Sequence, residues 1–136
     1  GWSSLGEVID ANGMILGRLA SYAAEQVKGG EDVDIVNAEQ AVVSGTAEEV
    51  FDRYRQRRET GSKESGPTYP KAPERIVARA VRGMLPDGSD GREAFKRLTA
   101  YRGNPEDRET DDIDVKTADD LRGREYVTVQ EISDNI

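Results

Sequence analysis

The chain of 136 residues contains no cysteine and no histidine. These absences exclude disulfides, the usual zinc sites and nucleophile pairs of the Cys–His or Ser–His kind. No apolar run approaches the ~20 residues that a membrane-spanning helix needs. The first residues, GWSSLGEV, have neither a charged n-region nor an apolar h-region. We therefore expect a cytoplasmic protein with no signal peptide and no membrane partner.

Apolar and aromatic residues are scarce as well. Hydrophobic residues make up 35% of the chain, which is low for a globular protein but above the level typical of disorder. One Trp, two Phe and five Tyr offer little material for stacking single-stranded bases. The length predicts a single domain over residues 1–136.

Charge is sorted into blocks along the chain. Residues 1–52 carry a net charge of −8, residues 53–103 of +7 and residues 104–136 of −7. The basic residues are fourteen Arg and five Lys. An Arg-rich basic strip inside an acidic protein is typical of a surface that binds phosphates.

Abundant carboxylates with few lysines favour a protein that works in molar salt. There the Debye length falls to about 3 Å, so RNA must be held by direct contacts, for which the planar Arg fork is suited. An ordinary acidic cytosolic protein is the open alternative. For the salt-adapted case we predict that the free protein is partly unfolded in dilute salt.

Hydrophobic periodicity and turn residues predict strands that alternate with helices near the N-terminus, which favours a parallel sheet covered on both faces. Glu59 to Pro73 reads as a loop, and residues 104–120 read as irregular apart from a helical turn at 117–121. The strands are expected at 7–9, 33–36, 41–43, 99–102 and 125–129. Helices are expected at 14–28, 73–85 and 91–98. A further helix is expected to begin after Thr46, which caps it, and to fray from Arg53 onward.

The helix expected at 73–85 carries two opposed stripes. Arg75, Arg79 and Arg82 share one face at 100° per residue, and apolar residues centre on the other. We predict that Ile76, Ala80 and Met84 lie in the core. At 1.5 Å per residue the arginine line is ~10 Å long, enough to reach more than one phosphate. A solvated amphipathic helix is the alternative, but Glu74 is the only acid on the helix.

Three further basic groups are candidates for RNA contact. The end of the preceding helix carries several arginines, although the helix macrodipole also favours cations there. The Gly-rich loop offers an aromatic that could stack a base or pack internally. On the short helix at 91–98, we expect Glu93 to pair with Arg97. The residues in these groups are Arg53, Arg57, Arg58, Lys63, Tyr69, Lys71, Arg92, Lys96 and Arg97.

Enzyme interpretations find little support. The turn at 13–17 lacks the GxGxxG pattern, and no GxxxxGK occurs. Asp111, Asp112 and Asp114 could bind a divalent cation, but an acidic loop is more often hydrated. We therefore expect no catalytic residue, no metal, no cofactor and no small-molecule substrate.

Four ordered motifs carry a family resemblance. They are LGRLAS (16–21), VNAEQAVVSG (36–45), VRGMLP (81–86) and GREAFKRLTAYRGNP (91–105). Together they resemble the universal large-subunit ribosomal protein thirteen family over about residues 7–105. The segment YPKAPERI (69–76) favours its archaeal branch, and the acidic composition resembles its salt-loving members.

The resemblance implies a three-layer α/β/α domain with a central four-stranded, mainly parallel sheet. It implies binding to large-subunit rRNA early in assembly, beside neighbouring ribosomal proteins, with Arg18, Arg79 and Arg82 as expected RNA contacts. Residues 106–136 are then an acidic C-terminal extension without assigned contacts. A free-standing RNA-binding regulator of translation remains the alternative, and a small nucleotide-dependent enzyme is a third hypothesis.

Overall fold

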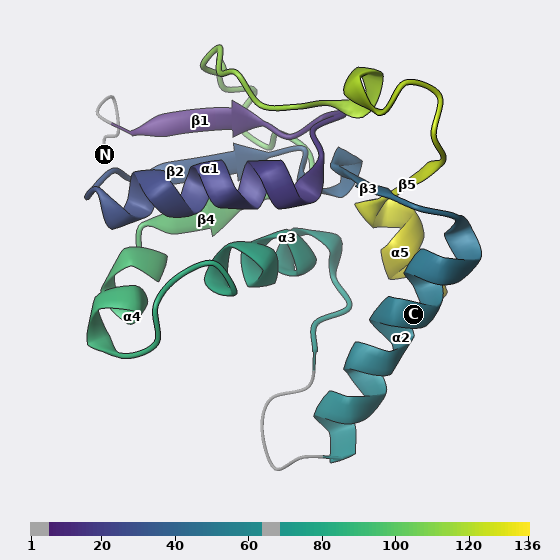
Figure 1. Ribbon diagram of the computed structural model, residues 1–136. Helices are drawn as coiled ribbons and strands as arrows, with labels where there is room; N and C mark the ends of the chain where they lie inside the picture. The colour runs from purple at the N-terminus through teal and green to yellow at the C-terminus, as the bar shows by residue number, and fades with distance from the viewer. Residues whose placement is uncertain (1–5, 64–68) are drawn as a thin grey trace.

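A three-stranded parallel sheet forms the centre of the protein in the computed structural model, which describes residues 6–63 and 69–136 (Figure 1). β1 (Glu7–Asp10), α1 (Leu16–Lys28) and β2 (Val33–Val36) make a βαβ unit. β4 (Leu98–Ala100) pairs in parallel with the other edge of β2. The predicted strands at 7–9 and 33–36 are confirmed.

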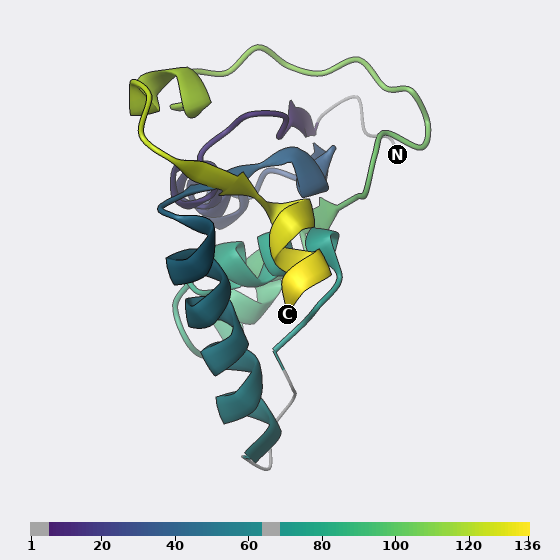
Figure 2. The same ribbon diagram turned by 90° about the vertical axis from the view of Figure 1, so that its right-hand side faces the viewer.

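Helices lie on one side of this sheet. α1, α3 (Pro73–Arg82) and α4 (Ser89–Phe95) pack together there, whereas the extended segment after β4 crosses the other side (Figures 1 and 2). This segment passes the free edge of β1, where the Asp111 N–H donates to the Val8 carbonyl oxygen at 2.8 Å. The Val8 N–H donates in turn to Asp111 Oδ2 at 2.8 Å. The three-layer α/β/α prediction required helices on both sides of the sheet. On this second side the structure has an extended segment instead.

The prediction of a four-stranded central sheet is wrong. β3 (Val42–Ser44) pairs antiparallel with β5 (Tyr126–Thr128) in a separate two-stranded sheet. After β2 the backbone turns sharply, with Asn37 in the left-handed region at φ 55°, into the 3₁₀ helix η2 (Ala38–Gln40). This turn leads the chain away from the edges of the parallel sheet before β3 begins.

The core joins the sheet to the helices. The predicted apolar face of α1 is confirmed, because Leu16, Leu19, Ala20, Ala23 and Val27 are all buried. Ile9 and Ile35 from the sheet and Ile76 from α3 are fully buried in the same cluster. Each such side chain contributes about 1.5–3 kcal/mol relative to leaving it in water.

α2 (Ala47–Lys63) is longer than predicted. It begins as expected, since Thr46 Oγ1 accepts a hydrogen bond from the Glu49 N–H at 3.2 Å. However, the helix continues to Lys63, so the predicted fraying at Arg53 and the predicted loop at 59–63 are wrong. Burial of Val50 and Tyr54 supports the helix through this polar stretch. Positions 64–68 of the predicted loop lie outside the described residues.

The C-terminal segment contributes to the core. The predicted turn is confirmed as the 3₁₀ helix η3 (Ala118–Leu121), and β5 leads into a helix that was not predicted, α5 (Val129–Asn135). The Glu131 N–H donates to Thr128 Oγ1 at 3.1 Å, which caps this helix. Val129 and Ile132 are fully buried in the main cluster, so this acidic segment packs as part of the fold.

Candidate nucleic-acid interface

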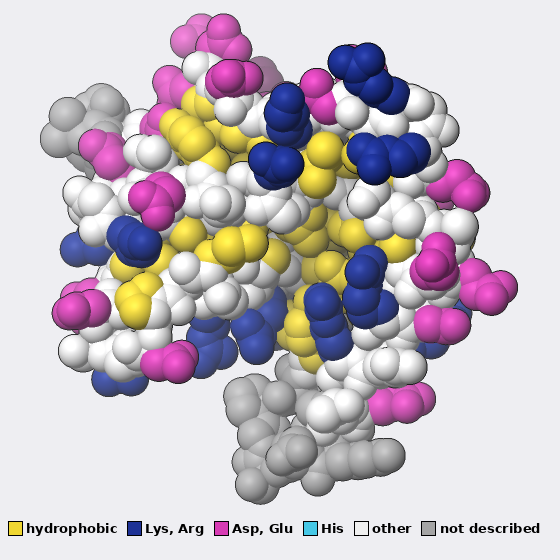
Figure 3. Space-filling view, in the orientation of Figure 1, with side chains coloured by type: hydrophobic (Ala, Val, Ile, Leu, Met, Phe, Trp, Pro, Cys, Tyr) yellow, Lys and Arg dark blue, Asp and Glu magenta, His cyan; other side chains and the backbone are white. Residues whose placement is uncertain are grey.

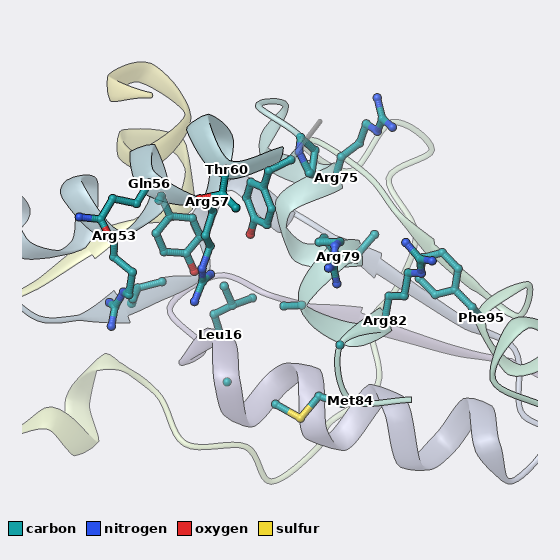
Figure 4. Close-up of a pocket in the computed structure, with 18 residues that line it drawn as sticks. Leu16, Arg53, Gln56, Arg57, Thr60, Arg75, Arg79, Arg82, Met84 and Phe95 are labelled. Atoms are coloured by element: carbon teal, nitrogen blue, oxygen red, sulfur yellow. The ribbon is translucent and has the colours of Figure 1, made fainter. Parts of the chain in front are cut away.

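A groove of about 1210 Å³ runs between α2 and α3. We call it the arginine groove, because its lining includes Arg53, Arg57, Arg75, Arg79 and Arg82. Leu16 at the start of α1 and Val43 of β3 also line it. Arginines of α2 and of α3 lie on opposite sides of the groove in Figure 4, and Figure 3 shows dark-blue side chains on both sides of a hydrophobic hollow. Two stretches separated by the chain between α2 and α3 thus build one cationic site.

The opposed stripes predicted for α3 are largely confirmed. Arg75, Arg79 and Arg82 are exposed. Ile76 is fully buried, and Ala80 is half-buried at the groove. The core prediction for Met84 is wrong, because its side chain is 47% exposed. The helix ends at Arg82, so the 100° periodicity no longer decides which way Met84 points.

Arg57 of α2 is held in place by aromatic rings. Its guanidinium carbon lies 4.6 Å from the centroid of the Tyr54 ring and 5.9 Å from that of Tyr69. Arg53, one turn earlier, lies 6.0 Å from the Tyr54 ring. Cation–π contacts of this kind orient a guanidinium without neutralising it, so both cations keep their charge for a ligand.

Positive charge in the groove is not compensated locally. The ion pairs in the described part of the chain involve five other cations, namely Lys28, Arg55, Lys96, Arg102 and Arg108. None of the five groove arginines has a carboxylate oxygen within 4.0 Å among residues 6–63 and 69–136. A protein with net charge −8 therefore gathers in one place five cations that have no ion-pair partner in the described part of the chain.

A hydrogen bond joins Arg58 of α2 to Tyr69, which is one of the residues that line the groove. The Arg58 guanidinium donates to the Tyr69 carbonyl oxygen at 2.9 Å, and both residues are half-buried. The Tyr69 ring packs edge-on against Tyr54, with 6.0 Å between centroids. Burial raises the pKa of the Tyr69 hydroxyl, although the neighbouring Arg57 and Arg79 cations lower it. Tyr69 thus packs against Tyr54 and also lines the groove, so its contact with RNA stays a prediction.

The three candidates on and after α4 have different environments. Lys96 Nζ lies 3.0 Å from Glu93 Oε2, so the expected Glu93–Arg97 pair is wrong. Arg97 instead reaches back to α1 and donates to the Val27 carbonyl oxygen at 3.0 Å. Arg92 is exposed, and no ion pair joins it to another described residue.

The remaining candidates are spread around the groove. Lys71 is exposed just before α3, and Arg18 is exposed in the first turn of α1. Lys63 ends α2, and its side chain lies outside the described part. The groove also includes Gln56 and Thr60, which sequence reasoning missed. Gln56 and Thr60 are three or four positions from Arg53 and Arg57, so all four lie on one face of α2. This pattern could be recognised only if the helix was predicted to continue beyond Arg53.

Other kinds of site find no support in the described residues. Among them, no group of three or more Asp and Glu side chains is arranged to hold a metal ion. No helix in those same ranges is long and apolar enough to cross a membrane.

Known proteins resemble this chain closely. The family model described as Ribosomal protein L13 matches residues 6–107. A relative from Methanosarcina barkeri is 47% identical over 131 residues, 93% of this chain and 94% of the relative. One from Halobacterium salinarum is 46% identical over 130 residues, covering 95% and 89%. One from Archaeoglobus fulgidus is 46% identical over 131 residues, covering 93% and 84%.

All three relatives are named large ribosomal subunit protein uL13, and all are archaeal. The family match covers most of the described core, including α1, α3 and α4. The resemblance seen in the four sequence motifs is therefore confirmed, and the chain belongs to the ribosomal protein L13 family.

Proposed function

We propose that this protein is a structural constituent of the archaeal large ribosomal subunit in the cytoplasm, and that it binds large-subunit rRNA through the arginine groove. The observation that carries the proposal is the gathering around one groove of five arginines that form no ion pair with another described residue. The names of the relatives supply the ribosomal setting. Neighbouring ribosomal proteins are then further partners, and the role needs no catalysis.

The two sides of the groove suit the two sides of an RNA backbone. Guanidinium forks bind phosphate oxygens with paired hydrogen bonds. Arg53 and Arg57 reach the groove from α2, and Arg79 and Arg82 reach it from α3 (Figure 4). Arginines of α2 and α3 would contact the phosphates of an RNA strand from its two sides. Such binding depends on the shape of the folded RNA.

Base stacking contributes little in this proposal. Tyr54 is buried and Tyr69 is half-buried, so neither presents an open ring face of the kind that stacks splayed bases. Recognition then depends on phosphate positions, with little dependence on base identity. An unstructured oligonucleotide of equal length should therefore bind more weakly than the folded rRNA fragment.

We also infer adaptation to high salt. The protein has 27 Asp and Glu against 19 Lys and Arg, and Arg outnumbers Lys. Exposed carboxylates keep a protein hydrated in molar salt, and direct Arg–phosphate contacts hold RNA there when long-range attraction is screened.

The decisive experiment pairs two double variants. Arg79→Ala with Arg82→Ala removes two groove cations, whereas Lys28→Ala with Arg102→Ala removes two cations already paired with Glu25 and Glu74. Each groove arginine should contribute about 1–3 kcal/mol to RNA binding, as a charged hydrogen bond does. Binding to a large-subunit rRNA fragment and co-sedimentation with large subunits would be measured beside thermal unfolding.

The groove variant should lose affinity and co-sedimentation while its melting temperature stays near that of the parent. Equal affinity of the groove and control variants would contradict the RNA-binding role of the groove. Parent protein found on messenger RNA and absent from large subunits would instead favour the free-standing regulator.

A further inference from the structure

A second group of cations lies on the same face as the arginine groove. Figure 3 shows dark-blue side chains above the groove, over the region where Figure 1 places the start of α1, η3 and β5. In the sequence this region contributes Arg18, Lys116, Arg122 and Arg124, which we call the C-terminal patch. Three of its four members follow residue 107, where the family match ends.

Backbone hydrogen bonds bring the patch together. The Ile15 N–H donates to the Lys116 carbonyl oxygen at 3.0 Å, which places Lys116 beside the start of the helix that carries Arg18. The Gly45 N–H donates to the Glu125 carbonyl oxygen at 2.9 Å. Arg124 consequently lines a small hollow with Thr46, at the beginning of α2.

The patch is therefore continuous with the arginine groove. The starts of α1 and α2 border the patch, and the same two helices contribute Leu16 and Arg53 to the groove lining. An RNA backbone that is bound in the groove and leaves it on this side would next contact the C-terminal patch.

Charge in the patch is available to a ligand. All four side chains are exposed, and none forms an ion pair with another described residue. Arg124 donates through Nε to the Leu121 carbonyl oxygen at 3.1 Å, and this bond uses one of its five N–H groups. The neighbouring Asp120 carboxylate accepts the Thr117 N–H at 2.8 Å, so it serves as a helix cap.

Arg122 has an unusual backbone conformation. Its φ is 54°, in the left-handed region, where it ends η3. Glycine or asparagine adopts this conformation at lower cost than a long side chain does. An arginine with this backbone conformation, inside a segment of net charge −7, supports a use for its cation.

We propose that the C-terminal patch is a second phosphate-binding surface for the same large-subunit rRNA. The inference rests on the proposed function and extends it to the acidic C-terminal segment. This segment then has two roles, since Val129 and Ile132 complete the core while Lys116, Arg122 and Arg124 hold RNA.

The test uses the full chain with Lys116→Ala and Arg122→Gly together. Neither side chain makes a hydrogen bond within the described residues, and glycine suits the left-handed backbone at 122, so the melting temperature should stay equal or rise. RNA affinity should fall about tenfold at low salt, and log K should depend on log[salt] with a slope shallower by about 1–2. The control is again Lys28→Ala with Arg102→Ala, which should bind within about twofold of the parent.

Each outcome decides between the two proposals. Parent-like binding by the patch variant, with weak binding by the groove variant, would overturn the patch and leave the proposed function standing. Parent-like binding by both would overturn both. The single variants Arg122→Lys and Arg122→Gly test the cation itself, because lysine should retain more affinity than glycine. Equal RNA affinity of the Arg122→Lys and Arg122→Gly variants would overturn the proposal that the C-terminal patch binds RNA.

Discussion

The guanidinium carbon of Arg57 lies 4.6 Å from the centroid of the Tyr54 ring, and the ring itself is buried. The pair therefore joins the core to the groove, because Tyr54 belongs to the hydrophobic cluster and Arg57 lines the groove. Replacing Arg57 by lysine keeps the charge but removes the planar fork and its stacking on the ring.

We expect Arg57→Lys to weaken rRNA binding by roughly 1 kcal/mol, the size of one lost charge-assisted hydrogen bond. Fluorescence anisotropy with a labelled rRNA fragment would measure it. Arg55→Lys is the matched control on the same helix, since Arg55 already pairs with Asp52 at 3.1 Å. An equal loss in both variants would show that the stacked position of Arg57 has no special role.

Arg97 is expected to act on folding. Its guanidinium donates to the Val27 carbonyl oxygen at the end of α1, where a cation also complements the helix macrodipole. Arg97→Ala should lower the free energy of unfolding by about 1 kcal/mol, because it removes one of two hydrogen bonds to that carbonyl oxygen and leaves the one from the Gly30 N–H. Urea unfolding would measure this, with the exposed Lys96→Ala as the control. A parent-like unfolding curve for Arg97→Ala would refute the structural role.

The cap of α5 gives a separate test of the C-terminal segment. Thr128 Oγ1 accepts the Glu131 N–H, and the helix carries the fully buried Ile132 into the core. Thr128→Ala should cost about 1 kcal/mol of stability, as loss of an N-cap usually does. The exposed Thr110→Ala, measured in the same thermal unfolding series, should have no such effect. Were both changes equally mild, α5 would not contribute to global stability.

Tyr22 predicts a loss of stability at alkaline pH. Burial, with the hydrogen bond that its hydroxyl donates to Glu7 Oε2 at 2.7 Å, raises the Tyr22 pKa from 10.0 to about 12. The native state then holds this proton more tightly than the unfolded chain does. The resulting stabilisation is complete below pH 10 and is lost as pH rises toward 12.

Unfolding by urea at a series of alkaline pH values, on the parent and on Tyr22→Phe, isolates this effect from other groups that titrate there. The parent should lose more stability than Tyr22→Phe over that range. Parallel curves for the two proteins would exclude a raised pKa at Tyr22.

Salt should stabilise the free protein. The N-terminal and C-terminal blocks carry −8 and −7, and repulsion between surface carboxylates acts over about 10 Å at 0.1 M salt but only about 3 Å at 1 M. We expect partial unfolding near 0.1 M KCl and folding above ~1–2 M, with bound RNA lowering the salt requirement. Circular dichroism over a KCl titration measures it. A cooperative thermal transition that does not move with salt would contradict the salt-adapted interpretation.

Local features of the fold were predictable from sequence. The apolar face of α1, the Thr46–Glu49 cap of α2 and the arginine stripe of α3 each depend on residues three or four positions apart, so helical periodicity contains them. The α5 cap Thr128–Glu131 has the same form and was present in the sequence. It was missed because residues 125–129 were interpreted as a strand, which places Thr128 inside that strand.

Only the tertiary structure decided which distant segments meet. β3 pairs with β5 across more than 80 positions of sequence, and Arg97 bonds to Val27 instead of the neighbouring Glu93. Periodicity placed Arg75, Arg79 and Arg82 on one face, but the groove needs α2 opposite them, and the patch needs Lys116 beside α1. Charge sign and helix faces are local properties of a sequence, whereas a binding surface depends on packing between elements that are far apart in the chain.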